Sequence, residues 1–248
     1  MRLNVYLQRA GVGSRREAER LVQEGLVLVN GKKAIATTPV EEGDEVVLNG
    51  KSVSPAKRGL PRLFLLNKPV DILVTNHDHQ NRPTVFEMRA LQDPTLPRLM
   101  SVGRLDVNSE GLLILSSDGP LAQAMMSPET GLDRVYRVRM RGRFTPNEIE
   151  KLAQGITVDG IRYRGAEFKE EEDKGGRTNS WYRVVLTEGK NREIRKLVQH
   201  FGGAVNRLIR VQYGPFHLDE LEAGELKEVP PRAVMRFIDD LEKKGHLK

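Results

Sequence analysis

A single carboxylate at the entrance to an apolar segment is the clearest candidate for chemistry in this sequence. Asp106 lies two positions after Arg104, in a polar, turn-prone stretch that precedes the apolar run 112–115. Such a run is typical of a buried strand, and a loop beside a rigid strand can hold a functional side chain at the edge of a cleft. Aspartate is also common in turns that serve no chemistry, so Asp106 alone leaves both interpretations open.

Two later segments could supply an aromatic ring and a cation to the same cleft. Tyr136 lies in the strand-like run 135–140, and Arg195 lies in a helix-like run that begins at Arg192. Tyrosine can stack on a pyrimidine base, although most tyrosines in strands pack in a core. Arg195 falls at the edge of its helix's apolar stripe, where an arginine can direct its guanidinium into a cleft. Such a cation favours the ionised form of a neighbouring carboxylate; the alternative is a solvated arginine.

The elements that would position these residues predict an α+β fold. After residue 62, strand-like runs outnumber helical ones, which favours a largely antiparallel, bent sheet. The expected strands cover 63–66, 72–75, 112–115, 135–140 and 181–186. The expected helices cover 120–126, 146–154, 192–201 and 232–243. We expect residues 62–248 to form one domain.

Residues 1–58 have the pattern of a smaller, separate domain. Apolar residues at helical spacing predict a helix over 3–10. A capping box of Ser14 and Glu17 predicts a second helix, on which Arg16 and Arg20 point away from the apolar stripe.

The end of this first block predicts a hairpin and then a linker. A strand over 26–29 leads into Asn30-Gly31, a dipeptide typical of tight hairpin turns. Further short strands are expected around Val40 and over 43–48. Proline, glycine and the pair Lys57-Arg58 make 51–62 resemble a semi-flexible linker.

The composition favours a polyanionic partner. The 248 residues carry a formal net charge of +6 and contain no cysteine, which excludes disulfides, thiolate nucleophiles and cysteine-based zinc sites. A basic balance is typical of proteins that bind nucleic acid, although charge alone also fits an indifferent basic surface. No apolar run reaches the roughly 20 residues needed to span a bilayer, so we expect a cytoplasmic protein that does not contact membranes.

The order of these motifs resembles the rRNA pseudouridine synthases of the RsuA/RluB family. The segments that carry the resemblance are Gly103-Arg104-Leu105-Asp106, 134–139 and 188–197, with a Lys-Pro motif at Lys68-Pro69. The first block, from Ser14 to Gly31, resembles an S4 RNA-binding domain. The resemblance covers nearly the whole chain and is strongest to the RluB branch. A glycine commonly stands one residue after the proline in this family, where the present chain has Asp71.

The resemblance implies an enzyme that isomerises a uridine of 23S rRNA without a cofactor or metal. It assigns Asp106 as the catalytic carboxylate, Tyr136 as the active-site tyrosine and Arg195 as the cation that pairs with the aspartate. The partner implied is ribosomal RNA or a ribosomal assembly intermediate, bound by a monomer. Basic residues expected to help hold the RNA are Arg16, Arg20, Arg104, Lys190, Arg192, Lys196, Arg207 and Arg210.

Two alternatives use the same motifs differently. An RsuA-like enzyme would modify 16S rRNA, and a non-catalytic assembly factor would keep the fold and bind RNA without chemistry. The joint presence of Asp106, Tyr136 and Arg195 argues against lost catalysis. His77-Asp78-His79 resembles a metal site only superficially, because neighbouring loop residues seldom converge on one ion.

Overall fold

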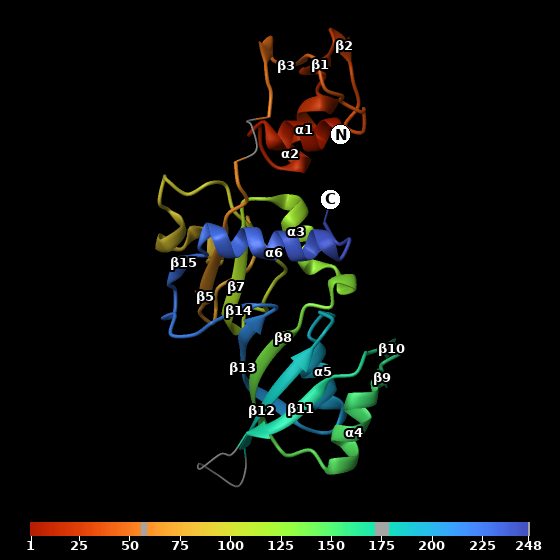
Figure 1. The fold of residues 1–248 in the computed structure, drawn as a ribbon, viewed down its shortest axis with the longest axis vertical. Helices are drawn as coiled ribbons and strands as arrows, with labels where there is room; N and C mark the ends of the chain where they lie inside the picture. The colour runs from red at the N-terminus through yellow and green to blue at the C-terminus, as the bar shows by residue number, and fades with distance from the viewer. Residues whose placement is uncertain (56–58, 172–178, 248) are drawn as a thin grey trace. The chain divides into compact units, whose positions relative to one another are not determined.

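The computed structural model describes residues 1–55, 59–171 and 179–247 of the chain (Figure 1). Contacts divide it into two compact units, Met1–Leu60 and Pro61–Lys248. The expected domain end at residue 58 and the basic pair Lys57-Arg58 lie outside the described residues. Among the residues that are described, no helix combines the length and apolar character needed to cross a membrane.

The smaller unit packs two helices against a short sheet. The elements are α1 (Leu3–Arg9), α2 (Arg15–Gln23), β1 (Val27–Val29), β2 (Lys32–Lys33), β3 (Val46–Leu48) and β4 (Lys51–Ser52), with strand order β2-β1-β3-β4. The predicted cap is present, since the Ser14 hydroxyl accepts a hydrogen bond of 3.2 Å from the Glu17 amide. Asn30 and Gly31 both have positive φ, 51° and 73°, as a two-residue hairpin turn requires.

The larger unit is built on one extended sheet. Its strand order is β11-β12-β8-β13-β7-β5-β15, with β14 beside β13 and β6 beside β7. The strands are β5 (Leu63–Lys68), β6 (Met100–Ser101), β7 (Glu110–Ser116), β8 (Arg134–Arg141), β11 (Glu167–Glu171), β12 (Asn179–Leu186), β13 (Ala204–Tyr213), β14 (Phe216–His217) and β15 (Leu226–Glu228). Among these pairings only β13 with β7 is parallel. The predicted α+β class with a largely antiparallel sheet is confirmed.

Helices and loops cover one face of this sheet along most of its width and the opposite face around β5 and β7. They are α3 (Gly119–Met126), α4 (Pro146–Gln154), α5 (Glu193–His200), α6 (Pro231–Lys243), three short 3-10 turns (Val85–Glu87, Arg89–Leu91 and Pro128–Thr130) and the small hairpin of β9 (Thr157–Val158) and β10 (Ile161–Arg162). One core joins α4, α5 and the segment 72–99 to one side of the sheet. A second core joins α3 and α6 to the opposite side of β5 and β7, where α6 crosses in Figure 1.

Three sequence predictions are corrected by the structure. Residues 72–75 do not form a regular strand and contribute only an isolated bridge between Leu73 and Thr84. Lys51–Ser52 pairs with β3 as a strand, so the linker is shorter than predicted. The ten-residue strand β13 was missed, because Asn206, Arg207, Arg210 and Gln212 interrupt its apolar pattern and its neighbours come from distant sequence.

Candidate active site

Asp106 lies on the loop that joins β6 to β7. Leu105 beside it is buried in the main core, and the Ser109 amide donates a hydrogen bond of 3.0 Å to the Asp106 carbonyl. Where the loop enters β7, Gly111 has a φ of +98°, and a side chain there would collide with the Arg210 carbonyl of β13. The loop is therefore fixed at one end by a buried leucine and at the other by a close strand contact that only glycine permits.

Two cations hold this loop through its main-chain carbonyls. The buried Lys68 ammonium donates to the carbonyls of Ser109 at 2.8 Å and Pro69 at 2.7 Å. The Arg195 guanidinium donates to the Asn108 carbonyl at 2.9 Å. Hydrogen bonds from charged donors are stronger than neutral ones. The turn that immediately follows Asp106 is thus clamped by residues from two distant elements, β5 and α5.

Asp71 keeps the backbone shape that a glycine would give. Its φ is +62°, in the left-handed region, which aspartate tolerates better than most residues with a side chain. Its amide donates a hydrogen bond of 2.8 Å to the Val107 carbonyl. The departure from the family's Lys-Pro-x-Gly pattern therefore leaves the contact with the Asp106 loop intact.

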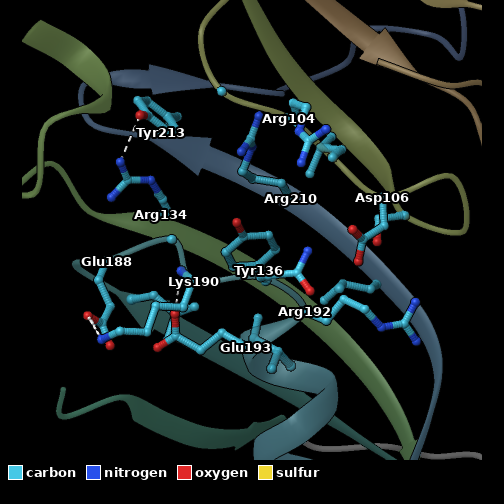
Figure 2. Close-up of a pocket in the computed structure, with 18 of the residues that line it drawn as sticks. Arg104, Asp106, Arg134, Tyr136, Glu188, Lys190, Arg192, Glu193, Arg210 and Tyr213 are labelled. Carbon is cyan, nitrogen blue, oxygen red and sulfur yellow. Dashed lines mark hydrogen bonds and ion pairs between the residues drawn. The ribbon is translucent and has the colours of Figure 1, made fainter. Parts of the chain in front are cut away.

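A cavity of about 680 Å³ opens beside this loop and brings several of the predicted residues together. Asp106, Tyr136, Arg104, Lys190 and Arg192 all line it. Tyr136 projects from β8 and is only 9% exposed, so its ring is largely fixed by packing while one part faces the cavity. In Figure 2 the Asp106 carboxylate points from its loop toward the side on which Tyr136 and Arg192 lie. The volume falls within the range typical of small-ligand sites.

Arg195 lies beside this cavity, and its contacts differ from the predicted pairing with Asp106. Its guanidinium binds the loop at Asn108 and approaches the Ser109 hydroxyl at 3.4 Å, and the ion pairs among the described residues include none between Arg195 and Asp106. Burial and the charge of Arg192 lower the pKa of Arg195, whereas the charge of Asp106 acts in the opposite direction. The charge of Asp106 therefore acts on Arg195, and Arg195 positions the loop that carries Asp106.

Two buried arginines give the inner wall of the cavity a positive charge. Arg210 donates from Nε to the Leu112 carbonyl at 2.7 Å, and its Nη2 has no hydrogen-bond partner among the described residues. Arg134 donates to the Tyr213 hydroxyl at 2.9 Å and to main-chain carbonyls. Both guanidinium groups lie against the Tyr213 ring, at 4.7 and 5.1 Å from its centroid. Their acceptors in these hydrogen bonds are neutral groups.

The start of α5 carries a buried pair of glutamates on the other wall. The Lys190 ammonium forms an ion pair with Glu188 (Figure 2), and the Lys190 amide donates to Glu193 at 3.0 Å. Burial raises the pKa of Glu193 to about 7, and the nearby charge of Glu188 adds to this effect. Burial also opposes ionisation of Glu188, but hydrogen bonds from Lys190 and the Arg164 amide outweigh it and lower its pKa. The charge of Lys190 is thus already compensated.

The remaining basic residues differ in their exposure and in their contacts. Arg192 is exposed at the start of α5, with a left-handed φ of +53°. Lys196 is half-buried and does not line the cavity, and Arg207 forms an ion pair with Glu110 at 2.6 Å. Arg16 and Arg20 are exposed on α2 of the smaller unit, as predicted. Arg20 binds Glu17 and Glu24.

Several residues of the site escaped the sequence analysis. Lys68 was noticed only as part of a motif, and its position after Asn67 at the end of β5 gives no signal in the sequence that the side chain is buried. Glu193 and Arg134 look like ordinary charged residues in the sequence, and their burial depends on segments that meet only in the folded chain. Asp78, in the apparent metal motif, instead binds Arg82 at 2.7 Å and organises its own loop.

Comparison with known proteins decides the family. A model of the RNA pseudouridylate synthase family matches residues 62–200, and a model of the S4 domain matches residues 1–46. The chain belongs to the RNA pseudouridylate synthase family. It is a pseudouridine synthase with an S4 domain at the start of the chain.

Related proteins agree over most of the chain. The enzyme is 41% identical to a protein from Rickettsia felis named an uncharacterized RNA pseudouridine synthase, over 92% of this chain and 96% of the relative. It is 40% identical to ribosomal large subunit pseudouridine synthase B from Xanthomonas campestris, over 94% of this chain and 48% of the relative. A crystal structure of a pseudouridylate synthase shares the fold with a TM-score of 0.67 at 23% identity, covering 96% of this chain and all of that one.

Proposed function

We propose that this enzyme converts a uridine of 23S rRNA to pseudouridine, with Asp106 as the catalytic carboxylate. The observation that carries the proposal is the cavity shared by the Asp106 carboxylate and the Tyr136 ring, beside cations with neutral partners. Relatives from Xanthomonas campestris and Pseudomonas aeruginosa are named ribosomal large subunit pseudouridine synthase B. Those names favour the large-subunit RNA over the alternative substrate, 16S rRNA.

The reaction is an isomerisation, and the arrangement of groups at the cavity suits it. The bond between C1′ and N1 of the uridine breaks, the base turns, and C1′ bonds to C5, from which a proton is lost while N1 gains one. Asp106 supplies a carboxylate fixed by a rigid loop, either to add to C1′ or to assist elimination to a glycal. Tyr136 offers a ring on which the pyrimidine can stack. Lys68 and Arg195 act as positioning residues for the loop.

The target uridine must leave its stack to reach the cavity. Extruding a base from a helix costs a few kcal/mol, and this cost is offset by contacts to the flipped base and to the RNA backbone. Arg104 and Arg192 are exposed cations at the cavity. We propose that these two residues contact the RNA there, with weaker contributions from Lys190 at the cavity and from Lys196 outside it. Residues 1–58 are proposed to bind RNA independently of the catalytic residues 62–248.

Asp106→Asn tests the role of the carboxylate. The substitution is nearly isosteric and removes the charge, so we expect pseudouridine formation to be abolished while RNA affinity and thermal stability stay close to wild type. Mapping of pseudouridines in rRNA, from cells that lack the protein and are complemented with each variant, gives the readout. Asp159→Asn, at an exposed hairpin turn with positive φ, is the matched control.

The same map separates the alternatives. Loss of one pseudouridine from 23S rRNA in the deletion strain and in the Asp106→Asn strain supports the proposal. Loss from 16S rRNA alone would assign the RsuA-like substrate instead. An unchanged map in both strains would favour a non-catalytic assembly factor.

A further inference from the structure

The sheet of the larger unit has a basic face that the proposed reaction does not use. Side chains alternate along β8, so Tyr136 and Val138 point into the core and the cavity, whereas Arg137, Arg139 and Arg141 point out on the opposite side. In Figure 1, β11 and β12 lie in view while α5 lies behind them. We call the exposed side of β11, β12, β8 and the first half of β13 the open face.

Strand register gathers further cations on the open face. Residues directly opposite each other in antiparallel strands point to the same side. Arg137 is opposite Arg183, which is opposite Lys169, and Arg139 is opposite Arg207. Three pairs of like charges are thus direct cross-strand neighbours. Such pairs destabilise a sheet unless groups of opposite charge lie nearby.

Carboxylates compensate only part of this charge. Arg137 binds Glu171 at 2.8 Å and Arg207 binds Glu110 at 2.6 Å. Among the described residues, the ion pairs include none that involves Arg139, Arg141 or Arg183. All three side chains are exposed. These three arginines on adjacent strands form the uncompensated centre of the open face.

An aromatic ring and a hollow lie within the same surface. Trp181 is opposite Arg139 on β12, and the Arg137 guanidinium lies 4.8 Å from the centroid of its ring. A hollow of about 320 Å³ is lined by Arg183, together with Gln212, His217 and Asp219. Rows of arginine with an interleaved aromatic ring suit a nucleic acid, because phosphates accept bidentate hydrogen bonds from guanidinium groups and bases stack on rings.

We propose that the open face is a second RNA-binding surface, which contacts the phosphates of an RNA segment other than the one in the cavity. Adjacent residues Tyr136 and Arg137 point to opposite sides of the sheet, so one short segment cannot occupy both places. Charge complementarity selects the occupant: RNA supplies a regular row of phosphates, and two-residue steps along β8 repeat the arginines about every 6.7 Å. This surface adds to the proposed function and does not depend on Asp106.

The test uses the full chain and a fluorescent RNA hairpin without uridine. The variant Arg139→Gln/Arg141→Gln/Arg183→Gln is compared with Arg232→Gln/Arg236→Gln/Lys243→Gln, which removes the same charge from exposed positions of α6. Each phosphate contact contributes about 0.7–0.9 to the slope of log affinity against log salt. We expect the first variant to lower the slope by about 2 and the affinity at least tenfold at about 0.1 M salt, and the control to change both much less.

The fluorescence of Trp181 provides a second readout, because Trp181 is the only tryptophan of the chain. We expect the RNA to protect its fluorescence from iodide quenching in the wild-type protein and in the α6 control. Equal affinity and salt slope in the two triple variants, or unprotected Trp181 in the RNA complex, would overturn the proposal. Binding of an acidic peptide that is lost in the first variant, with RNA affinity unchanged, would assign the face to a protein. In Arg139→Gln/Arg141→Gln/Arg183→Gln, the single-turnover rate of pseudouridine formation at saturating substrate RNA should equal that of the wild type.

Discussion

The ammonium of Lys68 donates a hydrogen bond of 2.8 Å to the carbonyl of Ser109, three residues beyond Asp106. Lys68 comes from β5 and is fully buried, while Arg195 of α5 donates to the preceding carbonyl, that of Asn108. The proposed catalytic carboxylate thus belongs to a turn whose carbonyls are bound from two sides. Precise placement of a reacting group lowers an activation barrier because little reorganisation remains.

Lys68→Met should lower the rate of pseudouridine formation more than RNA affinity. The substitution keeps an unbranched apolar stem but leaves the Ser109 and Pro69 carbonyls without their donor, and an unsatisfied buried polar group costs about 1–3 kcal/mol. We expect a lower melting temperature and a slower single-turnover rate on bound RNA. Lys227→Met, at an exposed position of neighbouring β15, is the control. A normal single-turnover rate in Lys68→Met would remove the clamp from the mechanism.

The pH dependence of stability offers an independent check on Lys68. Burial lowers the pKa of Lys68 to about 8 in the folded protein, below the value of about 10.4 in an unfolded chain. The unfolded state therefore binds more protons between about pH 8 and 10.4, and this group makes the free energy of unfolding rise with pH there. Denaturant titrations should show this contribution in the wild type and its loss in Lys68→Met.

Glu193 should make the free energy of unfolding fall as the pH rises, in a lower pH range than Lys68. Its folded pKa of about 7 exceeds the value of about 4.3 expected when unfolded, so the folded state holds the extra proton. Its contribution to stability is complete below about pH 4.3 and is lost as the pH rises to about 7. Glu193→Gln should flatten this decline, whereas Glu150→Gln at an exposed site of α4 should not. Parallel curves for wild type and Glu193→Gln would contradict the assignment.

The contributions of the Tyr136 ring and of its hydroxyl to activity can be tested separately. Tyr136→Phe keeps the surface on which a base stacks, whereas Tyr136→Leu removes it. Stacking of a base on an aromatic side chain contributes about 1–3 kcal/mol, so we expect the leucine variant to lose far more activity than the phenylalanine variant. Single-turnover assays with saturating RNA measure the difference. Equal activity in all three forms would exclude Tyr136 from the site.

The two arginines of α2 should differ in their effect on RNA binding. Arg20 already binds Glu17 at 2.5 Å and Glu24 at 2.8 Å, whereas the ion pairs of the described residues include none with Arg16. Arg16→Gln should therefore lower RNA affinity more than Arg20→Gln, with a larger loss at low salt. Binding assays across a salt series would show this order. The reverse order would mean that RNA replaces the glutamates at Arg20.

The sequence by itself determined the family, the fold class and most of the helices. Local signals were sufficient where an element carries its own boundary, as at Ser14 before α2 and Asn30-Gly31 between β1 and β2. The apolar run after Gly111 likewise predicted β7. These features depend on residues only a few positions apart, so the pattern contains the physical cause.

Only the tertiary structure decided how the charged residues divide between the cavity, the core and the surface. Arg195 has the periodicity of an edge residue, but its contact with Asn108 requires a segment 87 positions away. Arg210 is buried and Arg207 is exposed within the same strand, β13, because each faces a different side of a sheet whose neighbours come from distant sequence. Burial and the pairing of charges depend on these long-range contacts, which a local pattern of residues does not contain.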